Sequence, residues 1–421
     1  MSSRRNFIKK GALAIGGVSL LGSKALSAEN SNHVPEFPGD TDIDLWNWVR
    51  QSYTVSPNII NLNNGGVSPQ PKQVQEVFEH YTRLSNEAPS YYMWRVVDKG
   101  RESVRRELAE LAGASIEEIA INRNSSEALE TIIFGIKLFK GDEVIVSDYD
   151  YPNMRNAWLQ REKREGIKLV WVKVPVGEDD EAKLTKLFTD AMTAKTRIVH
   201  ITHMINWTGQ ILPAKKITEE AHKRGLEVVL DAAHSFGQIQ FSLHDLGVDY
   251  AGVSLHKWLC APFGTGFIYV KSDKIADLWP LFAPENPASA DIRKFEALGT
   301  RSNPAEMAIG RAISFHLTIG SARKEARLRF LKNYWVNKTK ALKGIKFFTP
   351  LSDKGSCALC NVGFEGKEAA DIESFLMEKY NIHCVAIKWE GVNGVRITPS
   401  TYTSTDDLDL LVEGLTAFSK T

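Results

Sequence analysis

The sequence predicts an α/β protein with a mainly parallel, seven-stranded β-sheet that is covered by helices on both faces. Short, nearly continuous apolar segments predict the strands, because a strand that is buried on both faces needs apolar side chains at successive positions. Segments with helical periodicity separate most of them, as in consecutive βα units. The seven predicted strands are residues 119–121, 143–147, 169–174, 197–202, 227–230, 250–254 and 266–270.

The remaining elements predict a second, smaller αβ domain, since 421 residues are too many for one ordinary core. Before the sheet we expect helices at 42–51, 71–84 and 98–112, and a short strand with its turn at 59–66. After it we expect a long helical region at 304–342, strands at 357–364, 382–387 and 394–398, and helices at 369–379 and from 405. The predicted parts are a signal peptide at 1–28, a linker and N-terminal segment packing on the small domain at 29–60, a large domain at 61–303 and a small C-terminal domain at 304–421.

The first 28 residues have the pattern of an export signal. Residues 3–9, with the pair Arg4 and Arg5, resemble the twin-arginine signal, and an apolar run at 11–21, too short to span a bilayer, precedes several small residues. No cysteine lies near these small residues, so a lipid anchor is not expected. We therefore expect the twin-arginine export machinery to carry the protein to the periplasm or the cell exterior; a disordered basic N-terminus is the alternative.

Composition excludes several classes of function. The formal net charge is +1, so no basic field indicates a nucleic-acid partner. The chain has four cysteines, too few for a disulfide framework. Two of them, Cys357 and Cys360, have CxxC spacing in an apolar, strand-like segment, where buried thiols are expected rather than a redox site. The spacing HExxH of a metal hydrolase is absent, although His200, His203 and His234 lie near Asp231 in the sequence.

A lysine and an aspartate after two successive strands point to pyridoxal 5'-phosphate. Lys257 follows the strand at 250–254, and Asp231 ends the strand before it. A lysine amine holds the cofactor aldehyde as an imine, while a carboxylate keeps the pyridine nitrogen protonated so that the ring accepts electrons. A buried, unpaired Asp231 would be costly, and a pyridinium cation would pair it. His234, one turn later, is a candidate catalytic group beside the ring or a core histidine.

Other polar side chains follow the predicted strands, where open α/β sheets bind ligands. Ser125 and Ser126 open a helix, which predicts an anion site for the cofactor phosphate or a plain helix cap. Ser254 and His256 flank the lysine and are also placed to reach the phosphate.

Two further residues are placed to contact the cofactor ring. Tyr151 is predicted to cover the pyridine face or to fill the core. Asn206 is predicted to donate to the phenolate oxygen of the cofactor or to stabilise a turn.

One arginine is a candidate for substrate binding. Arg396 lies in a short apolar strand, where its charge is costly without an anion. A substrate carboxylate that forms a bidentate pair would supply this anion, and a structural ion pair is the alternative. Residues 299–304 form another polar loop between the two predicted domains.

The sequence resembles class-V aminotransferases, which have PLP-dependent transferase fold type I, and within them the isopenicillin-N epimerase-like branch. The resemblance runs from about residue 61 to the C-terminus and rests on seven elements in family order. These are residues 63–69, 125–128, 206–209, 231–234, 254–257, 299–301 and Arg396.

The resemblance implies a role for each candidate residue. Lys257 would hold the cofactor and carry protons at Cα, and Tyr151 would stack on the ring. Thr300 would reach the phosphate of the partner subunit, which implies a homodimer. The remaining roles are pyridine pairing by Asp231, phosphate binding by Ser125, Ser126, Ser254 and His256, a contact of Asn206 with the phenolate oxygen, and substrate binding by Arg396, Asn64 and Arg301.

The expected function is that of an aminotransferase or epimerase that acts on an amino acid through an external aldimine. A C–S lyase or cysteine-desulfurase-like enzyme is an alternative. A desulfurase needs a nucleophilic cysteine on the loop before the carboxylate-binding arginine, and residues 386–393 contain none; Cys384 lies inside a predicted strand. A non-catalytic PLP-fold binding protein is a further alternative, which the presence of Lys257, Asp231 and Arg396 disfavours. A nucleotide-binding oxidoreductase is disfavoured because the GxGxxG motif is missing.

Overall fold

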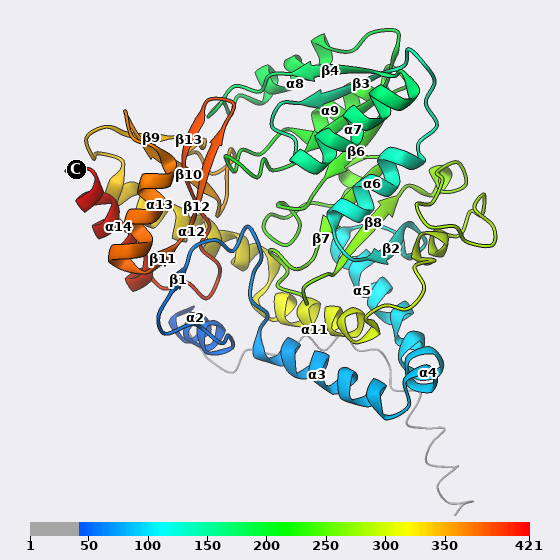
Figure 1. Ribbon diagram of the computed structural model, residues 1–421, viewed down its shortest axis with the longest axis horizontal. Coiled ribbons are helices and arrows are strands. Elements are labelled where there is room, and N and C mark those ends of the chain that lie inside the picture. Colours follow the sequence, from blue (N-terminus) through cyan, green and yellow to red (C-terminus); the bar gives the residue numbers. More distant parts are fainter. Residues whose placement is uncertain (1–41) are drawn as a thin grey trace, which may run out of the picture. The chain divides into compact units, whose positions relative to one another are not determined.

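The computed structural model describes residues 42–421 (Figure 1). The predicted export signal at 1–28 and the first part of the predicted linker lie outside the described residues, so both stay predictions. The helix predicted at 42–51 is confirmed as α2 (Asp42–Gln51). Among the described helices, none has the length and apolar character that a membrane crossing requires.

All seven predicted strands are confirmed and belong to one sheet. They are β2 (Ile119–Asn122), β3 (Glu143–Ser147), β4 (Lys168–Val172), β5 (Thr196–Thr202), β6 (Glu227–Asp231), β7 (Tyr250–Ser254) and β8 (Gly266–Val270). Their order is β2-β8-β7-β6-β5-β3-β4. β8 runs opposite to the other six strands and pairs antiparallel with β2 and β7, while the remaining four strand pairs are parallel, so this sheet is mainly parallel, as predicted.

The central strands are apolar at successive positions because each face of the sheet has its own core layer. On β5, Val199 and Ile201 enter one layer and Ile198 enters the other. On β6, Val228 and Val229 likewise point to opposite layers. This alternation of buried side chains explains why the sequence shows continuous apolar segments there instead of a polar–apolar alternation.

Helices cover both faces of this sheet. One layer contains α6 (Ser125–Gly135) and α7 (Pro152–Glu165). The other contains α5 (Arg101–Ala112), α8 (Glu181–Asp190), α9 (Ala214–His222), α10 (Leu243–Leu246) and α11 (Asn303–Ile319). Helix α3 (Lys72–Glu87) lies alongside α11 (Figure 1). The short helices are α4 (Pro89–Tyr91), η1 (Tyr92–Val96), η2 (Val97–Gly100), η3 (Ile116–Glu118), η4 (Ser272–Lys274) and η5 (Ile292–Glu296).

A second, antiparallel sheet follows in the C-terminal part. Its strands are β9 (Ile345–Phe347), β10 (Cys360–Phe364), β12 (Val385–Trp389) and β13 (Val392–Ile397), in the order β12-β13-β10-β9. Helices α12 (Ser321–Thr339), α13 (Ala369–Tyr380) and α14 (Thr405–Phe418) contribute to a third apolar core with it. The two sheets lie on opposite sides of the predicted domain boundary in the sequence, and the exact boundary stays a prediction.

Two predicted elements are divided in the structure. The long helical region at 304–342 breaks at Gly320, whose φ of +87° is accessible to glycine and ends α11. The strand predicted at 382–387 is divided at Cys384 because its two halves have different partners. β11 (Ile382–His383) pairs with β1 (Ile60–Asn61), whereas β12 pairs with β13.

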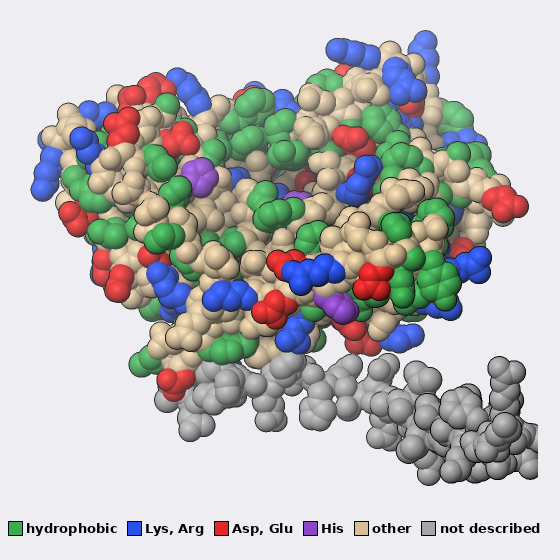
Figure 2. Space-filling model, turned by 60° about the horizontal axis from the view of Figure 1, so that its bottom comes forward, with side chains coloured by type: hydrophobic (Ala, Val, Ile, Leu, Met, Phe, Trp, Pro, Cys, Tyr) green, Lys and Arg blue, Asp and Glu red, His purple; other side chains and the backbone are tan. Residues whose placement is uncertain are grey.

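The surface and the cysteines agree with the composition. Figure 2 shows Lys and Arg side chains interspersed with Asp and Glu over the described part of one face. All four cysteines are buried and none forms a disulfide.

Gly209, in the loop after β5, should be a point where a single methyl group destabilises the fold. Its φ is +74°, and a Cβ atom there would lie 2.3 Å from the carbonyl oxygen of Leu359. Gly209→Ala should therefore lower the free energy of unfolding by about 2 kcal/mol or more, measured by urea unfolding. Gly177 is the matched control, because its φ is +77° but no atom of the described residues lies within 4 Å of the same position. Gly177→Ala should cost only about 1 kcal/mol; equal shifts of the two midpoints would contradict the steric argument.

Candidate active site

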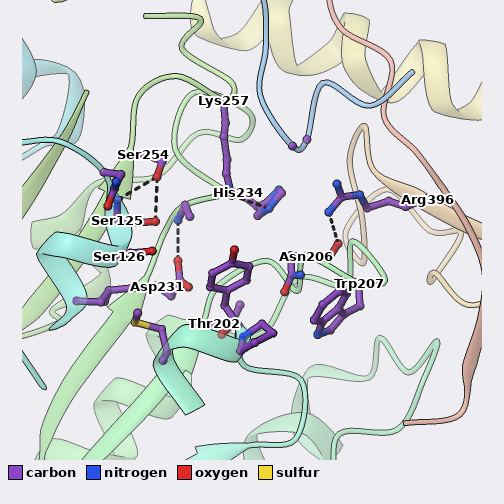
Figure 3. Close-up of a pocket in the computed structure, with 18 of the residues that line it drawn as sticks. Ser125, Ser126, Thr202, Asn206, Trp207, Asp231, His234, Ser254, Lys257 and Arg396 are labelled. Carbon is purple, nitrogen blue, oxygen red and sulfur yellow. Dashed lines mark hydrogen bonds between the residues drawn. The ribbon is translucent and has the colours of Figure 1, made fainter. Parts of the chain in front are cut away.

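A cavity of about 440 Å³ lies at the carboxyl ends of β5, β6 and β7 and brings ten predicted site residues together (Figure 3). This volume is typical of a small-molecule site. The ten residues that line it are Ser125, Ser126, Tyr151, Asn206, Asp231, His234, Ser254, His256, Lys257 and Arg396. Asn64, Thr300 and Arg301 do not line it.

Lys257 lies between the two ends of the cavity, in contact with His234 (Figure 3). The lysine Nζ is 2.9 Å from the histidine Nε2. Burial lowers the pKa of Lys257 to about 8, although the carboxylate of Asp231 acts in the opposite direction. Burial, together with the charges of Lys257 and Arg396, lowers the pKa of His234 well below its usual value. His234 is therefore neutral and accepts a hydrogen bond from the protonated lysine through Nε2.

This contact determines the tautomer of His234. Because Nε2 accepts, Nδ1 carries the proton in the neutral ring. Nδ1 is buried and has no hydrogen-bond partner among the described residues. The ring therefore presents an unpaired donor that a ligand oxygen would satisfy.

Asp231 is a buried carboxylate at the end of β6, with Thr202 opposite it on β5. Its Oδ1 accepts one hydrogen bond, 2.9 Å long, from the backbone N–H of Ala233. Burial raises the pKa of Asp231, while this N–H group and the charge of Lys257 oppose the shift. A cationic ligand atom beside the carboxylate would stabilise its charged form.

The end of the cavity formed by the start of α6 is suited to bind an anion. Helix α6 begins at Ser125 and is capped by Asn124, whose Oδ1 accepts from the N–H of Glu127 at 2.9 Å. Ser254 Oγ accepts from the N–H of Ser125 at 3.0 Å and donates to its hydroxyl at 2.9 Å. With Ser126, the start of α6 thus provides hydroxyls and N–H groups at the positive end of a helix, as phosphate sites do.

His256 lies beside this anion site. Its Nδ1 donates to the carbonyl oxygen of Thr265 at 3.2 Å, because a carbonyl only accepts. The hydrogen bond orients the imidazole on the loop that carries Lys257.

Arg396 lies on β13 at the side of the cavity away from the serines (Figure 3). Its side chain donates to the backbone oxygen of Asn206 at 3.1 Å and to Asn63 Oδ1 at 2.9 Å. Its Nε is buried and has no hydrogen-bond partner within residues 42–421. Among the described residues, no carboxylate forms an ion pair with it. Burial lowers the pKa of Arg396 to about 10. This buried cation, bonded only to neutral acceptors, is suited to a ligand carboxylate.

Asn64 has a structural role that differs from the predicted one. Its amide accepts from Tyr402 at 2.8 Å and from Asn61 at 3.2 Å, and donates to the backbone oxygens of Thr398 at 2.9 Å and Asn61 at 3.0 Å. These four bonds use the whole amide, so none of its groups is available to a substrate. The preceding residue, Asn63, contacts Arg396 instead.

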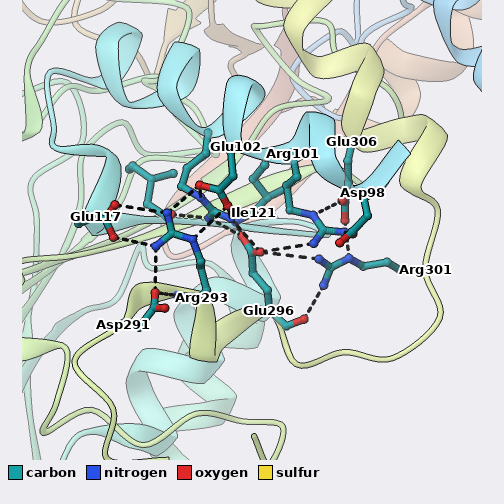
Figure 4. A network of polar contacts seen from close by, with 12 residues as sticks. Asp98, Arg101, Glu102, Glu117, Ile121, Asp291, Arg293, Glu296, Arg301 and Glu306 are labelled. Carbon is teal, nitrogen blue, oxygen red and sulfur yellow. Dashed lines mark hydrogen bonds and ion pairs between the residues drawn. The ribbon is translucent and has the colours of Figure 1, made fainter. Parts of the chain in front are cut away.

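Arg301 lies in a separate polar region (Figure 4). Thr300 and Arg301 line the same pocket there. Arg301 Nε is 2.7 Å from Glu306, and its NH2 nitrogen is 3.7 Å from Glu296. Glu296 also pairs with Arg105 at 2.5 Å. These partners compensate Arg301 outside the cavity, so the structure does not place it beside Arg396. The contact of exposed Thr300 with a partner's phosphate stays a prediction.

Sequence reasoning gave no role to several side chains that line the cavity. They are Thr202, Trp207, Val385 and Ile387. Trp207 directly follows Asn206, and Thr202 ends a predicted strand. Their positions in the sequence could therefore have predicted that they line the cavity. Val385 and Ile387 are two residues apart, so the sequence predicts that they share one face of a strand. It does not indicate that this face lines the cavity.

No cysteine lines the cavity. Burial raises the pKa of Cys357, Cys360 and Cys384 to about 12 each, so these thiols are poor nucleophiles. In the part of the chain that the structure describes, no group of three or more metal-binding side chains is present.

The cavity residues fit pyridoxal phosphate. The anion site at the start of α6 suits its phosphate, and Asp231 suits its pyridine nitrogen. The unpaired Nδ1 donor of His234 suits its phenolate oxygen, and Lys257 suits its aldehyde. A separate anion site at Arg396 remains for a substrate.

Lys257 should capture pyridoxal phosphate at a lower pH than an ordinary lysine. An amine is nucleophilic only above its pKa, and that of Lys257 is lowered from 10.5 to about 8. The rate constant of capture by the apoprotein, followed by absorbance, should rise up to about pH 8 and then level off. Because Asp231 raises the pKa of Lys257, Asp231→Asn should move the midpoint to lower pH. A wild-type midpoint near the free-lysine value of about 10.4 would contradict this account.

Comparisons with known proteins agree with this geometry. Residues 60–411 match the family model for aminotransferase class-V. Isopenicillin N epimerase of Streptomyces clavuligerus is 28% identical over 391 residues, 89% of this chain and 98% of that protein. A probable cysteine desulfurase of Synechocystis is 25% identical over 403 residues, 88% of this chain and 94% of that protein.

A solved structure shows the same fold. The apo cysteine desulfurase of Thermococcus onnurineus NA1 has a TM-score of 0.80 at 21% identity and covers 89% of this chain and 98% of that one. The fold is therefore PLP-dependent transferase fold type I, and pyridoxal 5'-phosphate is the cofactor. The chain belongs to the class-V aminotransferase family.

Proposed function

We propose that the protein transfers a proton at the Cα of an α-amino acid or a derivative of one, as an aminotransferase or an epimerase similar to isopenicillin N epimerase. One observation carries this proposal. One cavity contains Lys257, Asp231 and Arg396, and no cysteine thiol lines it. Among the described residues, no carboxylate pairs with Arg396, which donates to neutral acceptors instead. The similarity to two isopenicillin N epimerases, both 28% identical, supports the same reaction class.

Each of these side chains has a distinct task in the proposed reaction. When bound, the cofactor ring takes up the electrons that Cα releases. Asp231 keeps the pyridine nitrogen protonated, and the guanidinium of Arg396 binds the substrate carboxylate and orients Cα. Lys257, with its pKa near 8, removes or returns the Cα proton near neutral pH. Neutral His234 orients the lysine Nζ through its 2.9 Å contact.

A C–S lyase is the second candidate, favoured by the similarity to cysteine desulfurases. Formation of a persulfide on the protein requires a cysteine nucleophile, but the connection between β12 and β13 consists of Glu390 and Gly391. Cys384, which precedes β12, is fully buried. Sulfur transfer to a protein thiol is therefore less favoured than the reactions proposed above. Elimination of a β-substituent from the substrate needs no such thiol, so it is the form of C–S lyase activity that we propose as the second candidate.

We further propose that the enzyme is an exported homodimer. The resemblance of residues 3–9 to a twin-arginine signal supports export. Exposed Thr300 lies outside its own cavity, which agrees with a contact to the partner's phosphate. Fractionation with an Arg4→Lys, Arg5→Lys variant and size-exclusion chromatography with light scattering test these two proposals separately.

The proposed reaction is tested with the purified holo-protein. Borohydride treatment should attach the cofactor to Lys257, as read by peptide mass spectrometry. Amino acids incubated in D₂O should then gain deuterium at Cα. A keto acid product would indicate transamination, and an inverted stereocentre would indicate epimerisation. Release of pyruvate with ammonia would indicate β-elimination. A bound cofactor without any exchange at Cα would instead indicate a non-catalytic binding protein and contradict the proposal.

Arg396→Lys should weaken substrate binding. Lysine keeps the charge but loses the planar fork that pairs with a carboxylate. We expect kcat/KM to fall about 100-fold, mainly through KM, while cofactor binding is unchanged. Arg197→Lys is the matched control, since its half-exposed side chain pairs with Asp142 at 3.4 Å, outside the cavity. An equal loss in both variants would contradict the role of Arg396.

A further inference from the structure

The side of the cavity that holds Arg396 has an apolar wall to which the proposed reaction gives no task. Trp207 lies there beside Arg396, across the cavity from Ser125 and Ser254 (Figure 3). Val385 and Ile387, two residues apart on β12, complete the wall. Because alternate residues of a strand share one face, both side chains point to the same side of β12. A substrate whose carboxylate binds Arg396 would therefore lie beside this wall.

The wall is held in place by a stack of aromatic rings. Trp207 packs on Trp389, with ring centroids 5.9 Å apart and planes at 22°. The guanidinium of Arg155 lies 4.7 Å from the centroid of Trp389 and 4.9 Å from that of Trp171. Cation–π contacts of this kind stabilise the arrangement of the rings. The stack thus connects the loop after β5 with the end of β12.

Hydrogen bonds fix the same wall from behind. Trp389 donates from Nε1 to the backbone oxygen of Asp148 at 3.0 Å, and Tyr149 donates to the backbone oxygen of Glu390 at 2.5 Å. Asn361 donates to the backbone oxygen of Trp207 at 3.0 Å. A wall held at both ends discriminates by shape, because it does not move to admit a poorly fitting group.

The charges around the cavity decide which side chains the wall accepts. Arg396 is the cation on this side, and the substrate α-carboxylate neutralises it. A second carboxylate beside Val385 and Ile387 would be buried without a partner, which is strongly unfavourable. Among the described residues, Asp231 is the only carboxylate that lines the cavity, and it would pair with the cofactor, so a substrate ammonium has no partner at the wall either.

We propose that Trp207, together with Val385 and Ile387, determines specificity for α-amino acids with a bulky, uncharged, apolar side chain. This inference rests on the proposed function, since it names the substrate class of the same cavity. Trp207 supplies the largest apolar surface of the wall, and β12 supplies its aliphatic part.

The test compares Cα deuterium exchange of several amino acids by the holoenzyme in D₂O, followed by proton NMR. Leucine and phenylalanine should exchange with a kcat/KM about 100-fold above that of glutamate or lysine. Trp207→Ala should lower kcat/KM for phenylalanine about 10-fold or more, through KM, and change that for alanine less than about 3-fold. Trp279→Ala, at a side chain 59% exposed and outside the cavity, is the matched control and should change neither value.

A second variant gives a gain that misfolding would not produce. Ile387→Lys places a cation on the wall and should raise the ratio of kcat/KM for glutamate to that for leucine about 10-fold or more. Equal wild-type rates for glutamate and leucine, or an equal loss for alanine and phenylalanine in Trp207→Ala, would overturn the inference. If instead no amino acid exchanges and borohydride leaves Lys257 unlabelled, the proposed function itself fails.

Discussion

The central constraint in this protein is a set of buried charges that the described chain does not fully compensate. Lys257, Asp231 and Arg396 line one cavity, and burial opposes the charged form of each. The one hydrogen bond of Asp231 and the neutral acceptors around Arg396 leave both groups ready for a charged partner. A pyridinium and a substrate carboxylate are such partners. These buried charges therefore lower the stability of the protein without cofactor and substrate, and they favour binding of both.

The sheet makes this arrangement possible because its strands are held from both faces. Val228 and Val229 of β6 enter opposite core layers, so the strand end that carries Asp231 is fixed from both sides. The second sheet supplies Arg396 on β13, and the stack of Trp207, Trp389 and Arg155 connects the two parts at the cavity. Rigid elements thus position the ionisable groups, while an apolar wall is left for selectivity.

The sequence predicted the strands and the place of the candidate site residues because both follow local rules. Continuous apolar segments identify buried strands, and the residue after such a strand lies at the ligand-binding edge, which located Lys257 and Asp231. Asn64 was misassigned because neighbouring residues in a turn point in different directions: its amide is used internally, and Asn63 reaches Arg396. The wall from β12 was missed because its contact with the loop after β5 is a tertiary one.

Urea unfolding of the apoprotein and of its Lys257→Met variant, each with and without pyridoxal phosphate, tests the central claim most directly. If the buried ammonium is uncompensated, the variant without cofactor should unfold at a higher urea concentration than the wild-type apoprotein. Addition of pyridoxal phosphate should then stabilise the wild-type protein far more than the variant. A variant that is less stable than the wild-type apoprotein, or that gains as much from the cofactor, would contradict the account.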